Sequence, residues 1–362
     1  MNALKKLLHR VEGFFDRKKN NTIQNNALIE NIHLLAYHGY GNEQQVHLKG
    51  RVLKGRALAE STADDGIFKN IRQMYKRFHS IELPNISVTV TFQGETREII
   101  TDEEGYYTVS FPMTRAASDA ALWHQIRVKL TRDGDEAYQT AWVQTPQPQT
   151  SFGVISDIDD TILQTGATDL FDAILTTFTK NATTRLSFPG VRELYQGLQK
   201  GTASHAVNPF FYLSNSPWNL FDFIDEFLQL KEIPRGSVLL RDYGIDKDKF
   251  VIDYDHKLNA IKTILRTYPD MPFILIGDSG EKDPEYYQQI AQQFTERILA
   301  IYIRDVSDDE RDEAVLKIAE QVEAMGVPML FMADSYTAAA HAAHQGWIDP
   351  KVKELIKSTL EE

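Results

Sequence analysis

In the first half of the chain, apolar and polar residues alternate with a period of two. The alternation recurs in several short segments, namely residues 46–52, 88–92, 107–111, 126–130 and 138–143. Such alternation is typical of antiparallel strands that bury one face, and turn signals such as Asp133-Gly134 separate them. We therefore predict a small antiparallel β-sandwich over residues 31–145. Apolar residues at helical spacing between Ile67 and Phe78 predict one helix inserted in it.

After the proline-containing linker at residues 145–149, short apolar runs alternate with longer amphipathic segments. The apolar runs predict strands at residues 152–156, 210–214, 237–241, 273–277, 299–303 and 328–333. The amphipathic segments predict helices at residues 217–229, 257–267, 284–293, 310–324 and 335–345. Strands that alternate with helices form right-handed βαβ units. We therefore predict a three-layer α/β domain with a parallel, Rossmann-like sheet over residues 150–362.

Residues 1–30 show neither the pattern of the predicted β-sandwich nor that of the predicted α/β domain. Residues 1–20 are rich in Lys and Arg and repeat Leu and Phe at helical spacing, which predicts a basic amphipathic helix. The polar residues 21–30 predict a linker. The helix has two interpretations: it lies on a membrane surface, or it packs on its own domain or on a second subunit. The sequence favours packing, because most amphipathic helices face a protein core.

Composition narrows the class of protein. The formal net charge is −12, which argues against nucleic acid as the main partner. Cysteine is absent, which excludes disulfides and thiolate metal sites. The sequence shows no apolar run of membrane-spanning length and no secretory signal. We expect a cytoplasmic protein, peripheral at the inner membrane face if residues 1–20 bind lipid. The partner of the β-sandwich stays open.

The candidate chemistry lies where predicted strands end or predicted helices begin. Polar residues gather there in several short motifs: Asp157-Ile158-Asp159-Asp160-Thr161, Ser214-Asn215-Ser216-Pro217-Trp218, Lys257, and Gly277-Asp278-Ser279-Gly280-Glu281-Lys282-Asp283. Ligands in open α/β sheets bind outside the carboxyl ends of the strands. The motifs therefore occupy the edge of the sheet where an active site is expected.

These motifs, in this order, resemble the phosphatases of the haloacid dehalogenase superfamily. The blocks around Asp157, Ser214 and Asp278 more specifically resemble the catalytic domain of the actin-patch-associated phosphatidate phosphatases. The resemblance covers roughly residues 150–340. It implies a haloacid dehalogenase-like fold and a Mg²⁺-dependent phosphatase that removes phosphate from a lipid phosphomonoester through an aspartyl-phosphate.

The resemblance also implies roles for the acids. Asp157 is the expected nucleophile, and Asp159 the expected general acid and then base. Mg²⁺ prefers oxygen ligands. The carboxylates of Asp157 and Asp278 and the backbone carbonyl of Asp159 are its expected ligands, and Asp283 is expected to support it, often through water. Asp283 also has the pattern of a helix N-cap ahead of a proline, and the two roles are compatible.

Four further residues are expected to bind substrate or stabilise the transferring phosphoryl group. Ser214 is the expected hydrogen-bond donor to phosphate, because Ser216 before Pro217 has the pattern of a helix N-cap. Asn215 and Thr161 are the other substrate-binding candidates, although Asn215 is also a common turn residue. Lys257 is expected to clamp the phosphoryl oxygens and the nucleophile; its alternative is a solvated surface lysine.

The expected lid over residues 164–188 is small, which leaves the site open to a bulky or membrane-embedded phosphomonoester; its apolar residues could instead pack on the sheet. Three other functions remain as alternatives. One is a phosphatase of a soluble phosphomonoester or phosphoprotein. Another is a receiver-like module phosphorylated on aspartate, and Asp159 argues against it, because retaining a phosphoryl group requires no proton shuttle. The third is a scaffold with an inert second domain.

Overall fold

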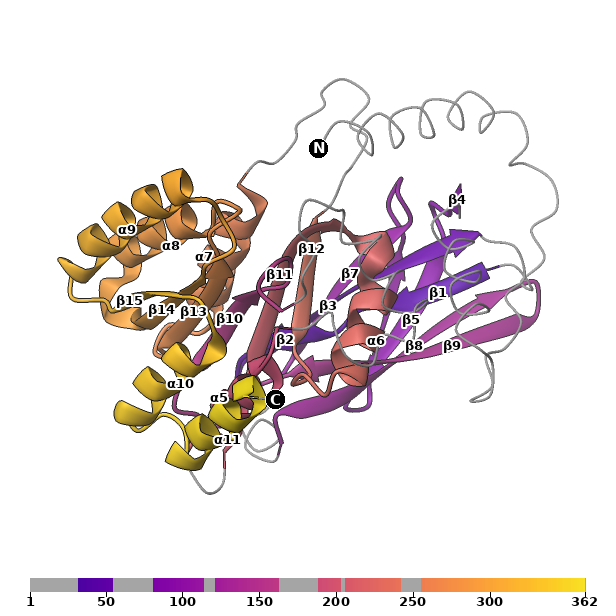
Figure 1. The fold of residues 1–362 in the computed structure, drawn as a ribbon. Helices are drawn as coiled ribbons and strands as arrows, with labels where there is room; N and C mark the ends of the chain where they lie inside the picture. Colours follow the sequence, from indigo (N-terminus) through magenta and orange to yellow (C-terminus); the bar gives the residue numbers. More distant parts are fainter. Residues whose placement is uncertain are drawn as a thin grey trace.

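The computed structural model describes residues 32–54, 81–113, 121–162, 188–202, 206–241 and 255–361. Within these ranges the chain forms two sheets that lie next to each other: a nine-stranded, largely antiparallel sheet and a six-stranded parallel sheet (Figure 1). The helix expected within residues 1–20 and the insertion between residues 67 and 78 lie outside the described residues. Nearly all of the expected lid, residues 164–187, also lies outside them.

The nine-stranded sheet contains the period-two segments of the first half. Its strands are β1 (Ile32–Ala36), β2 (Gly39–Gly41), β3 (Gln45–Lys54), β4 (Ile81–Glu82), β5 (Ser87–Phe92), β6 (Glu95–Ile100), β7 (Tyr106–Pro112), β8 (Trp123–Arg132) and β9 (Asp135–Gln144). The β8–β9 hairpin turns at Asp133 and Gly134, whose φ angles of 53° and 92° are those that a two-residue hairpin turn needs. The strands expected from the alternation are therefore confirmed.

Hydrogen bonds connect all nine strands into one sheet that folds over its own core. The short strand β2 makes this connection, because it pairs with β3 in antiparallel and with β9 in parallel orientation. Buried side chains from β3 and β7 pack against those from β5, β8 and β9 in one cluster. Phe92 and Phe111, for example, have ring centroids 5.8 Å apart. The arrangement thus differs from two separate antiparallel sheets by the parallel β2–β9 pair.

The parallel sheet has the strand order β12-β11-β10-β13-β14-β15. Its strands are β10 (Gly153–Asp157), β11 (Phe210–Pro217), β12 (Ser237–Arg241), β13 (Phe273–Asp278), β14 (Ile298–Arg304) and β15 (Met329–Met332). The chain moves outward from β10 to β12, then returns to the centre and continues in the other direction from β13. The order therefore reverses between β10 and β13, and such a switch point leaves a crevice at the carboxyl ends of the two strands.

Helices cover both faces of the parallel sheet (Figure 1). One face packs against α5 (Val191–Lys200), α6 (Phe221–Leu230), α10 (Ser335–His344) and α11 (Pro350–Glu361). The other packs against α7 (His256–Thr267), α8 (Asp283–Phe294) and α9 (Asp309–Glu323). Successive strand residues such as Val154 and Ile155 belong to opposite cores, which explains why the strands are apolar throughout. The predicted parallel sheet is confirmed.

Some helix boundaries differ from the prediction. Ser216 and Pro217 continue β11, and the chain becomes helical only at the short 3₁₀ helix η2 (Trp218–Leu220). The interpretation of Ser216 as an N-cap and Pro217 as the first helical residue is therefore wrong. Helices α5 and α11 were not among the predicted helices, and a second 3₁₀ turn, η3 (Thr295–Arg297), precedes β14.

The nine-stranded sheet contacts the segment that follows Ser214. Tyr37 stacks on Trp218 with ring centroids 4.4 Å apart. The buried Arg51 donates from Nη1 to Asn219 Oδ1 (2.8 Å) and from Nε to the carbonyl of Glu104 (2.9 Å). These contacts link β3 to the turn at the end of β11, and thereby support one wall of the crevice.

The link through Arg51 can be tested by the change Arg51→Ala. It removes charge-assisted hydrogen bonds at a buried position, so we expect the free energy of unfolding to fall by about 2 kcal/mol. Urea denaturation followed by tryptophan fluorescence measures the change. Arg132→Ala is the control, because Arg132 forms a surface ion pair with the neighbouring Asp133, and we expect a change within about 0.5 kcal/mol. Equal effects of the two changes would contradict the proposed link.

Candidate active site

The carboxyl ends of three adjacent strands bring the motifs together. Asp157 is the last residue of β10, Asp278 is the last residue of β13, and Ser214 lies in β11 one residue beyond Leu213, the partner of Asp157. All three side chains are buried. The sequence folds in this way because each apolar run pairs in the sheet up to the point where its polar residues begin. The motifs therefore meet at the switch point of the parallel sheet.

Three carboxylates form a compact cluster there. Asp157, Asp278 and Asp283 each offer an oxygen, and these oxygens all lie within 4.8 Å of one another. Asp278 Oδ1 accepts hydrogen bonds from the backbone N–H groups of Gly280 (2.7 Å) and Glu281 (3.0 Å). Asp278 Oδ2, by contrast, is buried and has no hydrogen-bond donor among the described residues. An all-oxygen donor set with one unsatisfied carboxylate oxygen fits a hard divalent cation.

Asp283 belongs to this cluster through its position on α8. The helix begins at Asp283 with Lys282 as its N-cap, and the Asp283 side chain points inward, where Oδ2 accepts from the backbone N–H of Asp278 (3.3 Å). The approach requires Gly277, since a Cβ atom there would lie 2.4 Å from Asp283 Oδ2. The prediction that Asp283 is the helix N-cap is therefore wrong, because Lys282 holds that position.

Burial raises the pKa values of the three clustered carboxyl groups, Asp157, Asp278 and Asp283. It raises the pKa of Asp278 from 3.8 to about 8, with a further rise from the neighbouring Asp283. Burial also raises the pKa of Asp157, although Lys257 opposes the shift. A carboxylate in this position holds a proton more strongly unless a cation compensates its charge. The cluster thus favours a bound cation on electrostatic grounds.

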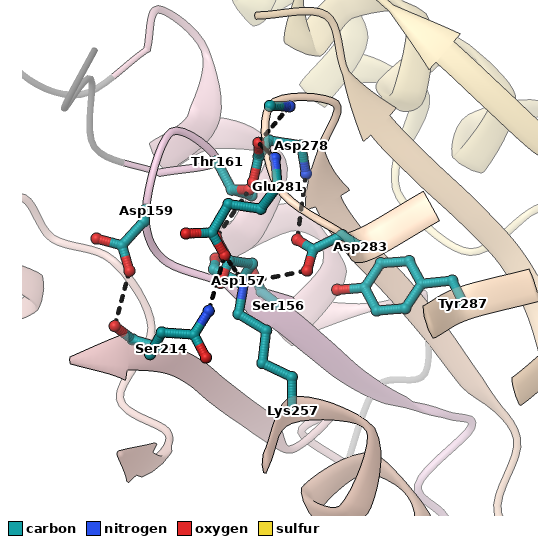
Figure 2. Close-up of polar contacts among 12 residues, drawn as sticks. Ser156, Asp157, Asp159, Thr161, Ser214, Lys257, Asp278, Glu281, Asp283 and Tyr287 are labelled. Carbon is teal, nitrogen blue, oxygen red and sulfur yellow. Dashed lines mark hydrogen bonds and ion pairs between the residues drawn. The ribbon is translucent and has the colours of Figure 1, made fainter. Parts of the chain in front are cut away.

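Lys257 supplies a positive charge inside the site. It is the second residue of α7, its side chain is only 2% exposed, and its Nζ lies 2.5 Å from Asp157 Oδ1, 2.7 Å from Glu281 Oε2 and 3.0 Å from Asp283 Oδ1 (Figure 2). Burial lowers its pKa, but the carboxylates outweigh burial and raise the pKa well above its usual value. Lys257 therefore stays charged, and the alternative of a solvated surface lysine is wrong.

Asp159 stands apart from the three clustered carboxylates. Its side chain points to β11, where Ser214 Oγ donates to Asp159 Oδ2 at 2.7 Å (Figure 2). Asp160 follows with a φ angle of 51°, so the chain turns directly after Asp159. Burial raises the pKa of Asp159 from 3.8 to about 7, and the Glu281 charge adds to the rise. A carboxyl group with this pKa can give up and take back a proton near neutrality.

The remaining candidates for phosphate binding lie at the same edge of the parallel sheet. Ser214 Oγ accepts from the backbone N–H of Ser216 (3.0 Å) in addition to its donation to Asp159. Thr161 Oγ1 donates to Asp157 Oδ2 at 3.4 Å. Asn215 Nδ2 donates to Glu281 Oε2 at 3.0 Å. The hydroxyl proton of Ser214 is thus directed at Asp159, so its expected role as donor to phosphate stays a prediction.

Known proteins resemble part of this chain. Residues 152–305 match the model of a family described as "Phosphatidate phosphatase APP1, catalytic domain". This segment is related to that catalytic domain. It contains every residue for which the sequence predicted a catalytic, substrate or metal role. The resemblance that we drew from the motifs is therefore confirmed.

Two curated relatives extend the comparison. Phosphatidate phosphatase APP1 of Saccharomyces cerevisiae is 35% identical over 162 residues, which are 44% of this chain and 27% of the relative. An uncharacterised protein of Schizosaccharomyces pombe is 24% identical over 304 residues, which are 83% of this chain and 46% of the relative. The chain thus spans less than half the length of either relative.

Similarity to solved structures is weak. A carbohydrate acetylesterase from Xanthomonas citri is 10% identical, with a TM-score of 0.26, and the match covers 81% of this chain and 74% of that one. The titin M3 domain is 15% identical, with a TM-score of 0.17, and the match covers 32% of this chain and 96% of that domain. Such TM-scores carry no argument about function.

Sequence reasoning missed the role of Glu281. Glu281 lies in the motif at residues 277–283, but the sequence predicted no function for it. Its Oε2 contacts both Lys257 and Asn215. Its place three residues after Asp278 was the available signal, but the direction of a side chain in a loop does not follow from spacing.

Two residues near this edge support the fold of the site. Arg304 is buried, stacks on Phe188, and donates from Nε to the carbonyl of Thr161 (3.2 Å) and from Nη2 to Ser335 Oγ (3.1 Å). The N-cap of α10 is Asp334, whose side chain accepts from the backbone N–H groups of Tyr336 and Thr337, so Ser335 is the first residue of the helix. Arg304 thereby holds the end of the Asp157–Thr161 motif against the sheet.

Within the described ranges, none of the helices combines the length and the apolar character needed to cross a bilayer. The expected surface contact through residues 1–20 lies outside those ranges.

The acid cluster predicts how metal and pH affect stability. Because the pKa of Asp278 is raised above its value in the unfolded chain, the folded metal-free protein holds a proton that the unfolded chain releases between about pH 4 and pH 8. The metal-free protein should therefore lose stability as pH rises through this window. A cation binds the deprotonated form, so Mg²⁺ should raise the melting temperature more at about pH 8.5 than at about pH 6.

Scanning calorimetry with Mg²⁺ or a chelator, at both pH values, measures this effect. Asp278→Asn is the informative variant, because the amide keeps the shape and removes the charge and the proton-binding group. Its melting temperature should respond much less to Mg²⁺. A Mg²⁺ shift in Asp278→Asn as large as in the wild type would show that the cation binds elsewhere.

Proposed function

We propose that residues 150–362 form a Mg²⁺-dependent phosphatase with haloacid dehalogenase-like topology, which removes phosphate from a lipid phosphomonoester of the phosphatidate type. The observation that carries the proposal is the environment of Asp157. Its carboxylate lies between the charged Lys257 and the acids Asp278 and Asp283, with the proton-carrying candidate Asp159 two residues away. The match of residues 152–305 to the phosphatidate phosphatase catalytic domain supports the same reaction.

Asp157 acts as the nucleophile. One of its carboxylate oxygens attacks phosphorus, a new O–P bond forms, and the bond between phosphorus and the ester oxygen of the leaving group breaks. Two anions repel each other, so the attack needs positive charge at the carboxylate. Lys257, 2.5 Å from Asp157, supplies a fixed charge. Thr161 Oγ1 contacts the other carboxylate oxygen and helps to orient it.

Asp159 moves the proton. Protonated Asp159 donates to the oxygen of the leaving alcohol, and the resulting carboxylate then takes a proton from the water that attacks the aspartyl-phosphate. That attack cleaves the phosphoryl–carboxyl linkage, restores Asp157 and releases phosphate. Ser214 orients Asp159 through its hydrogen bond. A raised pKa near 7 suits both halves of this cycle.

The cation belongs to the cluster of carboxylates. Asp157 and Asp278 are the proposed side-chain ligands, the backbone carbonyl of Asp159 the proposed third ligand, and Asp283 holds the site together or supports the metal through water. When bound, Mg²⁺ would neutralise charge between the nucleophile and the phosphoryl oxygens. Lys257 and Asn215 complete the proposed phosphate site, and Ser214 joins them as a donor when its hydroxyl turns from Asp159 to the phosphoryl group.

The proposed substrate is a lipid phosphomonoester. The segment between Asp157 and Ser214 is short in sequence, which supports a small lid that leaves the site open. An open site accepts a phosphomonoester with a large apolar body. Contact of residues 1–20 with the cytoplasmic face of a membrane would bring the site to such a substrate. A soluble phosphomonoester or a phosphoprotein is the alternative.

Phosphate release separates these functions. We expect release from phosphatidate in detergent micelles in the presence of Mg²⁺, and slower release from glycerol 3-phosphate and p-nitrophenyl phosphate. Asp157→Asn should lower kcat by more than about a thousandfold, because the amide is a poor nucleophile. Asp270→Asn removes the same charge in the exposed turn before β13, at the opposite edge of the sheet, and should leave kcat unchanged.

Two results would contradict the proposal in different ways. Undiminished release by Asp157→Asn would rule out the mechanism. Release from the soluble esters alone would rule out the lipid substrate and leave the mechanism standing.

A further inference from the structure

The side chain of Glu281 lies across the proposed phosphate site (Figure 2). Its Oε2 accepts a hydrogen bond from Lys257 Nζ at 2.7 Å and one from Asn215 Nδ2 at 3.0 Å. These are two of the donors that the proposed function assigns to the phosphoryl group, and the inference rests on that assignment. A carboxylate and a phosphoryl oxygen have the same charge sign and need the same donors. Glu281 and substrate therefore compete for one position.

The backbone at Glu281 is held firmly, whereas its side chain has room to leave. The Glu281 N–H donates to Asp278 Oδ1 at 3.0 Å, and Arg311 Nη2 donates to the Glu281 carbonyl at 2.7 Å. Arg311 also donates to the carbonyl of Ser279 at 2.8 Å and forms a two-point ion pair with Glu285. The side chain of Glu281 remains 37% exposed, in contrast to the 2% of Lys257. Rotation of the side chain alone can take its carboxylate into solvent without moving Asp278.

We propose that Glu281 is a gating carboxylate that substrate must displace and that returns when the product forms. Lys257 cannot satisfy Glu281 and a phosphate dianion at the same time without placing like charges side by side, which is strongly unfavourable. A large phosphomonoester gains binding free energy from contacts beyond its phosphoryl group and can displace the carboxylate. Inorganic phosphate has only the phosphoryl contacts. Glu281 thus weakens product binding selectively and promotes phosphate release.

The proposal predicts a distinctive effect of Glu281→Gln. The amide has the same shape and keeps a carbonyl oxygen for Lys257 and Asn215, but it no longer repels phosphate. The inhibition constant of inorganic phosphate should fall by about tenfold or more, KM should fall less, and kcat should not rise. Glu323→Gln, at the exposed C-terminal end of α9, removes the same charge far along the helix from Arg311 and should leave all three constants unchanged.

A direct binding measurement accompanies the kinetics in the full-length protein. With Mg²⁺ present, inorganic phosphate should raise the melting temperature of Glu281→Gln more than that of the wild type or Glu323→Gln. Glu281→Asp keeps the charge and shortens the side chain by one methylene group. It should bind phosphate with an affinity between those of the wild type and Glu281→Gln, and it provides the test if the glutamine variant folds poorly.

The outcomes separate this proposal from the proposed function. If the wild type is active and Glu281→Gln has the same inhibition constant for phosphate, the proposed gating role of Glu281 is wrong and the proposed phosphatase function stands. A rise in both KM and that inhibition constant with a fall in kcat would also overturn it, because Glu281 would then serve to position Lys257. If the wild type releases no phosphate from any ester, the proposed function fails. The melting-temperature comparison then decides whether Glu281 competes with phosphate.

Discussion

The charge of Lys257 inside a buried group of carboxylates is the interaction on which the site depends. Asp157 and Asp283 are fully buried, and the lysine contacts both as well as Glu281. Isolated buried charges are strongly unfavourable, and one ammonium group cannot neutralise several carboxylates. Burial, with a further contribution from the neighbouring Asp283, raises the pKa of Asp278 to about 8, and the surplus negative charge favours a bound cation. The same charge imbalance thus favours a cation beside Asp157, the proposed nucleophile.

The fold concentrates these charges without requiring long loops. The strand order reverses between β10 and β13, so Asp157 and Asp278 face each other at the ends of neighbouring strands. Ser214 follows on the other side of β10, and the first turn of α7 brings Lys257 to the same edge. The nine-stranded sheet contributes from outside through Tyr37 and Arg51, which contact the turn after β11. Strands and helix starts therefore hold Asp157, Asp278 and Lys257, whereas the loop residue Glu281 has a side chain that is 37% exposed.

Much of this arrangement could be predicted from the sequence because two patterns are strong. Apolar runs such as residues 273–277 mark strands buried on both faces, and their polar ends mark the edge at which the motifs meet. The connection through β2 could not be predicted, because a three-residue strand, Gly39–Gly41, carries no readable alternation. Its parallel pairing with β9 depends on tertiary packing. Helix α5 had a readable apolar spacing in Val191, Leu194, Tyr195 and Leu198, which the prediction did not use.

In the candidate site, too, some features could be predicted from the sequence and others could not. The strand-end positions identified Asp157 and Asp278 as residues that would meet. A local helix rule failed at Asp283, because this residue has the type of a cap but turns its side chain inward to the backbone N–H of Asp278. Whether a side chain caps its own helix or reaches across the site depends on the neighbouring loop. The hydrogen bond from Ser214 to Asp159 and the contacts of Glu281 join residues far apart in the chain, so no spacing rule could reveal them.

The central claim is that Asp157 carries the phosphoryl group during turnover. Rapid acid quench of the enzyme during hydrolysis of a phosphomonoester, followed by peptide mapping with mass spectrometry, tests it most directly. We expect a phosphoryl group on Asp157, and none on that peptide in Asp157→Asn. A phosphoryl group on Ser214 or Asp159, or full turnover by Asp157→Asn, would show that Asp157 is not the nucleophile.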